Sequence, residues 1–82
     1  MANQNTSPQV FDVRPLGTVL GSCRTTVVQQ SGGLRIVRLV MMAGRELPPH
    51  TAPGDASLIC IEGRLAVTIE GRSVRLSAGQ LM

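Results

Sequence analysis

The sequence has almost no aromatic residues. Its 82 positions include no Trp, no Tyr and a single Phe, Phe11. Trp and Tyr are the side chains that most often anchor strong protein interfaces and stack on nucleic-acid bases. Their absence excludes recognition built on aromatic anchors, and any partner must be held by aliphatic or polar contacts.

Long apolar runs are also missing. The longest, LVMMAG at positions 39–44, is far shorter than the ~20 apolar residues of a membrane span. The opening MANQNTSPQ lacks the positive start and apolar core of a signal peptide. We therefore expect a cytoplasmic protein with no membrane partner. In that setting the only two cysteines, Cys23 and Cys60, are predicted to be free thiols.

The basic residues are all arginines, and they give the chain a net charge of +3. They are dispersed along the sequence. The two closest pairs, Arg35 with Arg38 and Arg72 with Arg75, are three residues apart, which on a strand places the members on opposite faces. Nucleic-acid binding requires basic residues clustered on one surface. We therefore predict a solvated basic surface and no nucleic-acid partner.

Glycine, by contrast, recurs about every ten residues, between short runs rich in Val, Ile and Leu. This pattern is typical of an all-β domain. We expect a flexible N-terminal tail at 1–9 and one domain at 10–82. Hairpins are predicted around Ser31-Gly32-Gly33 and around Gly71, with a tight turn at Gly63 between the runs 57–62 and 64–70. Short N-terminal strands are expected at 10–13, 19–20 and 25–30.

The apolar pattern differs between two of these strands. Leu65, Val67 and Ile69 alternate with more polar residues, which predicts one apolar face. The run 36–42 is apolar on both faces except at Arg38. A strand buried on both faces needs a second layer, from another sheet or from a partner subunit.

Two glycine-based motifs add a resemblance. Gly44 is followed after five residues by His50, and the next strand ends at Gly63. Further on, Gly71 is followed after five residues by Ser77-Ala78-Gly79. This order, over residues 34–82, resembles the cupin motifs G-x5-H-x-H…E-x6-G and G-x5-P-x-G, with Ser77 in the proline position. The resemblance implies a small double-stranded β-helix, or jelly-roll barrel.

That barrel would be C-terminally incomplete in this chain, because the cupin family has further strands after the second motif. An open barrel exposes strand edges, which natural proteins avoid. The chain is then a piece of a longer protein, or its N-terminal strands cover the gap, or two subunits pair strands. We expect a homodimer.

Metal-binding cupins use three histidines and one carboxylate, and here the resemblance leaves only His50 in a matching position. Ala52 and Ala56 stand where the second histidine and the glutamate belong. Asp55 is one residue away, a shift that turns a strand side chain to the opposite face. We expect no cofactor and no full metal site, with a weakly bound divalent metal at His50 as the alternative.

A pocket without metal is the remaining candidate. Period-two spacing places Leu58 and Cys60 on one face, and the resemblance turns that face toward the barrel interior with His50. Cys60 is either a thiolate activated by His50 or a small buried hydrophobe. Arg38 either faces inward and holds a carboxylate or faces outward over apolar surface. The predicted ligand pocket is His50, Leu58, Cys60 and Arg38, with no catalytic residue assigned.

These observations favour a cupin-like domain that binds a small organic ligand in its cavity. The first alternative is a metal-dependent cupin enzyme, of the dioxygenase or isomerase type, whose ligands are completed outside this chain. The second alternative is a sensory or structural cupin module.

Overall fold

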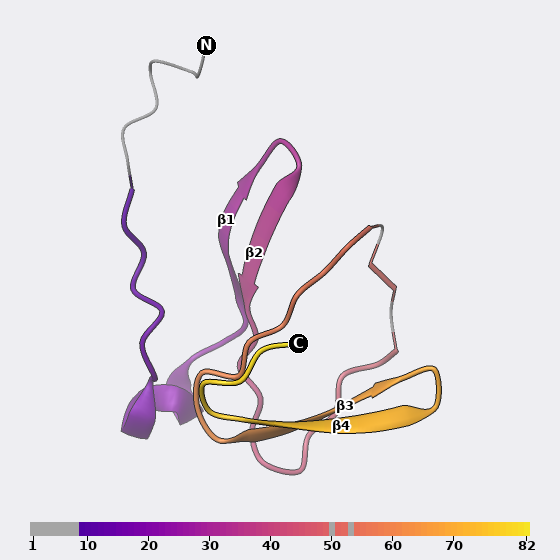
Figure 1. Cartoon of the computed structure of the whole chain (residues 1–82). Helices are drawn as coiled ribbons and strands as arrows, with labels where there is room; N and C mark the ends of the chain where they lie inside the picture. Colours follow the sequence, from indigo (N-terminus) through magenta and orange to yellow (C-terminus); the bar gives the residue numbers. More distant parts are fainter. Residues whose placement is uncertain (1–8, 50, 53) are drawn as a thin grey trace.

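The computed structural model describes residues 9–49, 51–52 and 54–82. In this part a 3-10 helix, η1 (Gly17–Ser22), precedes four strands, β1 (Thr26–Ser31), β2 (Leu34–Arg38), β3 (Arg64–Ile69) and β4 (Arg72–Ser77). The strands form two separate antiparallel hairpins, β1–β2 and β3–β4 (Figure 1). The all-β prediction is confirmed, while the described residues contain no closed barrel.

The β1–β2 hairpin forms at the predicted place. Ser31 pairs with Leu34, and Gly32, with a φ of 46°, occupies the two-residue turn between them. The register shifts between Val27 and Gln29, so that Val28 is an extra residue in β1. A bulge of this kind bends the strand and increases its twist.

The β3–β4 hairpin is closed by Glu70 and Gly71, between the paired residues Ile69 and Arg72. Both turn residues have positive φ, 52° and 77°, as a type I′ turn requires. Thr68 and Ser73 face each other next to the turn, and their hydroxyls are hydrogen-bonded at 2.9 Å. The predicted second hairpin is therefore confirmed, with one non-glycine residue in the left-handed region.

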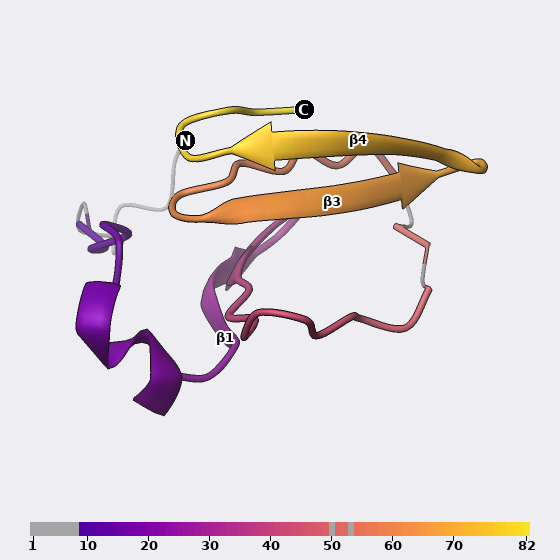
Figure 2. The ribbon, with the colours of Figure 1, turned by 90° about the horizontal axis from the view of Figure 1, so that it is seen from below.

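After β4 the chain turns back and pairs with the segment that precedes β3 (Figure 2). Gly79, with a φ of 88°, lies in the turn, and the Gln80 side chain accepts a hydrogen bond from the Ser77 amide at 2.7 Å. Leu58 and Met82 then exchange two backbone hydrogen bonds of 2.9 Å, and the Cys60 amide donates to the Gln80 carbonyl at 2.9 Å. We call this pairing of 58–60 with 80–82 the return ladder.

The least exposed of the described residues lie in the return ladder and in β4. Among the described residues, only Cys60 and Leu76 are buried, each with 5% of its surface exposed. Leu65 and Val67 of β3 are half-buried, and their polar neighbours on the strand are exposed. The predicted apolar face of this strand is thus confirmed, although Ile69 at its end stays largely exposed.

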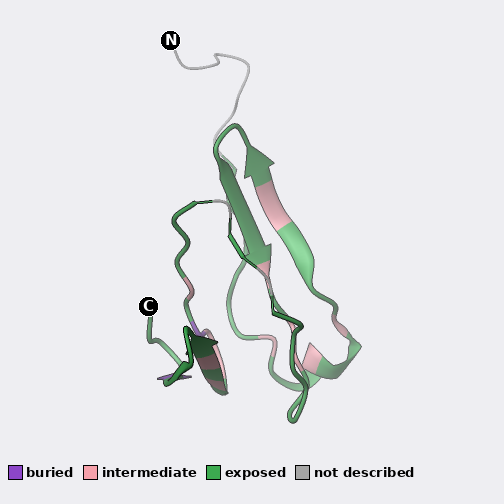
Figure 3. Cartoon of the chain, turned by 90° about the vertical axis from the view of Figure 1, so that its right-hand side faces the viewer, coloured by how far each residue is buried: buried purple, intermediate pink, exposed green. Residues whose placement is uncertain are grey.

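Two sequence-based predictions about strands were wrong. Residues 10–13 form no strand, and Val19 and Leu20 lie in η1. Only two apolar residues stand between Gly17 and Gly21, too few for a ladder, and the Val19 and Cys23 amides bond to carbonyls three residues back. For the run 36–42, β2 ends at Arg38 and this chain alone gives no cover on both faces, since Ile36, Val37, Leu39 and Met42 are exposed; a second layer from a partner subunit stays a prediction (Figure 3).

The two hairpins do not pack on each other in the described part of the chain. The segment 12–17 ties them together by hydrogen bonds. Arg38, at the end of β2, donates to the Arg14 carbonyl, while Glu62, just before β3, accepts from the amides of Leu16 and Gly17. Large apolar side chains are exposed on both hairpins, such as Val27 and Ile36 on the first and Ile69 and Val74 on the second. Apolar surface is therefore left open on both hairpins.

Candidate functional site

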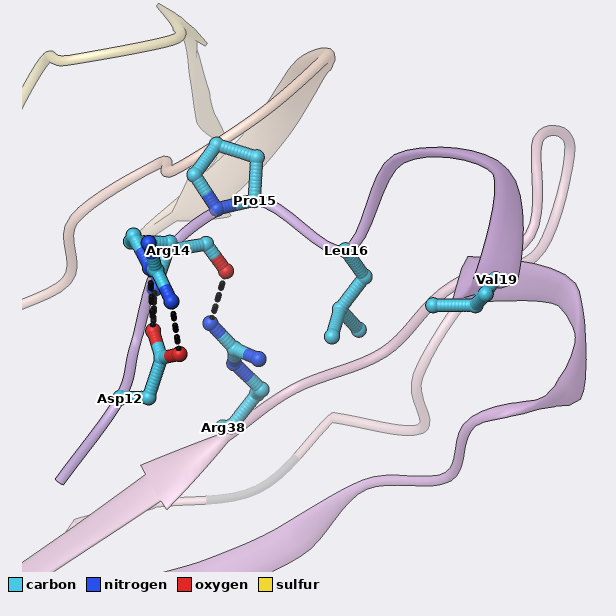
Figure 4. A pocket seen from close by; sticks show the side chains of 6 residues that line it. All are labelled: Asp12, Arg14, Pro15, Leu16, Val19 and Arg38. Atoms are coloured by element: carbon cyan, nitrogen blue, oxygen red, sulfur yellow. Dashed lines mark hydrogen bonds and ion pairs between the residues drawn. The ribbon is translucent and has the colours of Figure 1, made fainter.

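Arg38 is positioned by the end of β2, where the strand leaves the hairpin beside the N-terminal segment. Its side chain is half-buried, and its Nη2 donates to the Arg14 carbonyl at 2.6 Å. Around it lies an open hollow of about 520 Å³, lined by Asp12, Arg14, Pro15, Leu16, Val19 and Arg38 (Figure 4). We call it the Arg38 hollow.

Asp12 and Arg14 form a bidentate ion pair in the Arg38 hollow. The Arg14 Nη2 lies 2.7 Å from Oδ2 of Asp12, and its Nε lies 3.0 Å from Oδ1. The side-chain hydrogen bond from Arg14, followed by the one from its backbone amide, holds the pKa of Asp12 far below its usual range. In return Asp12 raises the pKa of Arg14. Each charge therefore compensates the other.

Arg38 has no such ion pair, although its charge also lowers the pKa of Asp12, after the larger effects of Arg14. In the part of the chain that the structure describes, no carboxylate lies within ion-pair distance of its guanidinium. Its one hydrogen bond to a carbonyl fixes the group without neutralising it. The residues that line the hollow thus carry one net positive charge, beside the apolar side chains of Pro15, Leu16 and Val19.

Leu58 and Cys60 lie elsewhere, in the return ladder. Cys60 is a buried free thiol, and its Sγ lies 3.5 Å from the Glu62 carbonyl and 3.7 Å from that of Gly63. Leu58 is half-buried, whereas Ile59 between them is 55% exposed. The period-two pattern is therefore present, but the lining of the Arg38 hollow includes neither Leu58 nor Cys60.

The histidine of the predicted pocket cannot be placed with them, because His50 lies outside the described residues. Ala52, Asp55 and Ala56 are all exposed. Within residues 9–49, 51–52 and 54–82, no three His, Cys, Asp or Glu side chains come together as metal ligands. In the same ranges, no helix has the length and hydrophobicity to cross a membrane.

Sequence reasoning missed the role of Glu62. Its Oε1 accepts from the Leu16 amide at 2.7 Å and its Oε2 from the Gly17 amide at 3.1 Å. The sequence indicated only the face on which Glu62 lies, because period-two spacing puts it on the face of Leu58 and Cys60. Its partners are backbone amides, which have no sequence signature. The ion pair of Asp12 with Arg14 could have been predicted, because an acidic and a basic residue stand two positions apart in one loop.

Comparison of the chain with protein-family models, curated proteins and solved structures finds no match. Function must therefore be argued from the residues. The site offers two distinct elements, a guanidinium in an open hollow and an apolar wall of buried or half-buried residues in the return ladder and the β3–β4 hairpin. We define this apolar wall as Leu58, Cys60, Leu65, Val67 and Leu76.

Proposed function

We propose that this chain is a cupin-like β domain that binds a small organic molecule on the apolar wall, without a full metal site. The observation that carries the proposal is the return ladder. It joins the segment before β3 to the β3–β4 hairpin in one connected unit, in which every residue of the wall is buried or half-buried. Mostly apolar surfaces with few polar groups suit small organic ligands.

The order of elements supports the cupin-like part of the proposal. The chain follows the order that the two motifs imply: the segment 58–60, the Gly63 turn, the β3–β4 hairpin, the Gly79 turn and the returning segment 80–82. In this proposal the described residues are one part of a jelly-roll barrel, and further strands complete it.

We propose that a second copy of the chain supplies the further strands and covers the exposed apolar surface. The exposed apolar side chains of both hairpins, Val27, Ile36, Ile69 and Val74 among them, offer surface for a standard interface of ~800 Å² per partner. Size-exclusion chromatography with light scattering is expected to give twice the mass of one chain, which is 8.7 kDa. A strict monomer at all concentrations would contradict the dimer.

A pair of matched variants tests ligand binding at the wall. The wild-type protein is screened by thermal shift against small apolar and carboxylated molecules, because a ligand specific for the folded state raises its apparent stability. Leu58→Glu places a charge on the wall and is expected to abolish the shift of an apolar ligand. Ile59→Glu, on the exposed neighbouring side, is the control and is expected to retain it. Equal loss in both variants would refute binding at the wall.

Elemental analysis separates this proposal from the metal-dependent enzyme. Purified protein is expected to contain no stoichiometric iron, manganese, nickel or zinc. One equivalent of metal that is lost in His50→Ala would overturn the metal-free proposal in favour of the enzyme. We also propose a cytoplasmic location, since the two free thiols, Cys23 and Cys60, fit a reducing compartment.

A further inference from the structure

We infer that the Arg38 hollow is a second binding site, which takes a small organic monocarboxylate with a short apolar tail. This site lies apart from the apolar wall and does not depend on the proposed function. Its three components are the Arg38 guanidinium, the neutralised Asp12–Arg14 pair and the apolar group of Pro15, Leu16 and Val19.

The guanidinium of Arg38 has more N–H donors than its hydrogen bond to the Arg14 carbonyl uses. Arginine carries five N–H donors in a planar fork, and here an Nη2 hydrogen bond goes to the Arg14 carbonyl. That bond, at 2.6 Å, orients the group before any ligand arrives. Because a fixed fork loses little freedom when it binds a carboxylate, its affinity is higher than that of a mobile arginine.

The charges of the hollow select the charge of the ligand. Asp12 offsets Arg14, so that Arg38 leaves one net positive charge among the residues that line the hollow. A monoanion neutralises that charge. A dianion such as phosphate is disfavoured, because its second charge would face the Asp12 carboxylate.

The apolar residues select the remainder of the ligand. Pro15, Leu16 and Val19 are the apolar residues that line the hollow, and Figure 4 shows Leu16 between the arginines and Val19. The volume, about 520 Å³, falls within the range of small-molecule sites. Each methylene that a ligand buries there strengthens binding about fourfold at most. An aliphatic acid of several carbons therefore binds better than acetate.

The test is a titration of the full chain with hexanoate, followed by NMR of the backbone amides. We expect saturable binding that shifts the amides of Leu16 and Val19. Acetate lacks the tail and hexan-1-ol lacks the charge, and each is expected to bind at least tenfold more weakly. If hexan-1-ol binds as well as hexanoate, the site is not a carboxylate site and the proposal fails.

Substitutions assign the binding to Arg38. Arg38→Gln is expected to weaken hexanoate binding at least tenfold, because a charge-assisted pair is lost. Arg35→Gln, in the same strand but on the opposite face, removes an equal charge outside the hollow and is expected to change affinity less than twofold. Equal effects of the two substitutions would indicate non-specific charge attraction and refute the site.

A variant that binds hexanoate more tightly gives a result that misfolding cannot produce. Asp12→Asn releases Arg14 from its ion pair and removes the only negative charge in the lining. We expect hexanoate to bind severalfold more tightly to this variant, and phosphate to begin to bind. Unchanged or weaker hexanoate binding in Asp12→Asn would overturn the proposal even if Arg38→Gln fails to fold.

Discussion

Glu62 and Leu16 are 46 residues apart in sequence, and the carboxylate of one accepts a 2.7 Å hydrogen bond from the amide of the other. The second oxygen of Glu62 accepts from the next amide, that of Gly17. One side chain thus satisfies two backbone donors at the start of η1, which no residue of η1 itself caps. This contact attaches the N-terminal segment to the β3–β4 hairpin.

Glu62→Ala is expected to detach that segment. Hydrogen bonds to charged groups contribute more than neutral ones, but Glu62 is only half-buried, so we expect a loss of about 1 kcal/mol in stability. Hydrogen exchange of the Leu16 and Gly17 amides should accelerate selectively. Glu46→Ala, at an exposed loop position, is the control and should leave both amides unchanged. Unaltered exchange in Glu62→Ala would contradict the contact.

Gly71→Ala is expected to destabilise the β3–β4 hairpin by about 1 kcal/mol, because a Cβ is unfavourable at a φ of 77°. Glu70→Asn should act in the opposite direction, since Asn-Gly is a preferred type I′ turn. Gly21→Ala serves as the control, because its φ is not in the positive range and an added Cβ meets no atom within 4 Å. Urea unfolding of the three variants measures the order, and equal effects of Gly71→Ala and Gly21→Ala would refute the turn assignment.

Cys60 should react with a thiol reagent much more slowly than Cys23. Cys60 is 5% exposed and Cys23 is half-buried, so that access differs between two thiols in the same protein. A Cys23→Ser variant should lose the fast phase of labelling and keep the slow one. A fast phase that disappears in Cys60→Ala would instead support the activated thiolate.

Asp12 should titrate at a lower pH than an ordinary aspartate. Its folded pKa is depressed by Arg14, so the ion pair is fully present above the usual pKa of about 3.9 and is lost only as the pH falls through the lower folded value. NMR of the Asp12 carboxyl in wild type and in Arg14→Gln measures the difference. We expect the midpoint to rise in Arg14→Gln, and an unchanged midpoint would contradict the pair. The effect on global stability should be small, since both side chains are more than half exposed.

Local features of the fold were predictable because their causes are local. Two-residue turns at Gly32-Gly33 and Glu70-Gly71 follow from the need for positive φ, and the alternation of Leu65 and Val67 sets the face of β3. The failure at Val19 and Leu20 is also local. Two β-branched or apolar residues between glycines match a strand in composition but have no ladder partner within reach.

The candidate site was predicted less well because its geometry is set by distant parts of the chain. The side chain of Arg38 was recognised as unusual from its place in an apolar run, but its partner is a carbonyl of residue 14, and any residue would supply that atom. Grouping Arg38 with Leu58 and Cys60 relied on a closed barrel. The described residues contain two separate hairpins, and the lining of the Arg38 hollow includes neither Leu58 nor Cys60, while the predicted pocket with His50 stays a prediction.

The separation of the two hairpins also has a kinetic consequence. Each hairpin contains only contacts between residues near in sequence, and such units form within about 1–10 μs. The bonds of Glu62 to Leu16 and Gly17 close a far longer loop, whose entropy must be lost before the contact stabilises anything. We therefore expect two fast and independent local phases in refolding, followed by a slower docking of the N-terminal segment, and Glu62→Ala should remove its docking onto the β3–β4 hairpin while the bond of Arg38 to the Arg14 carbonyl remains.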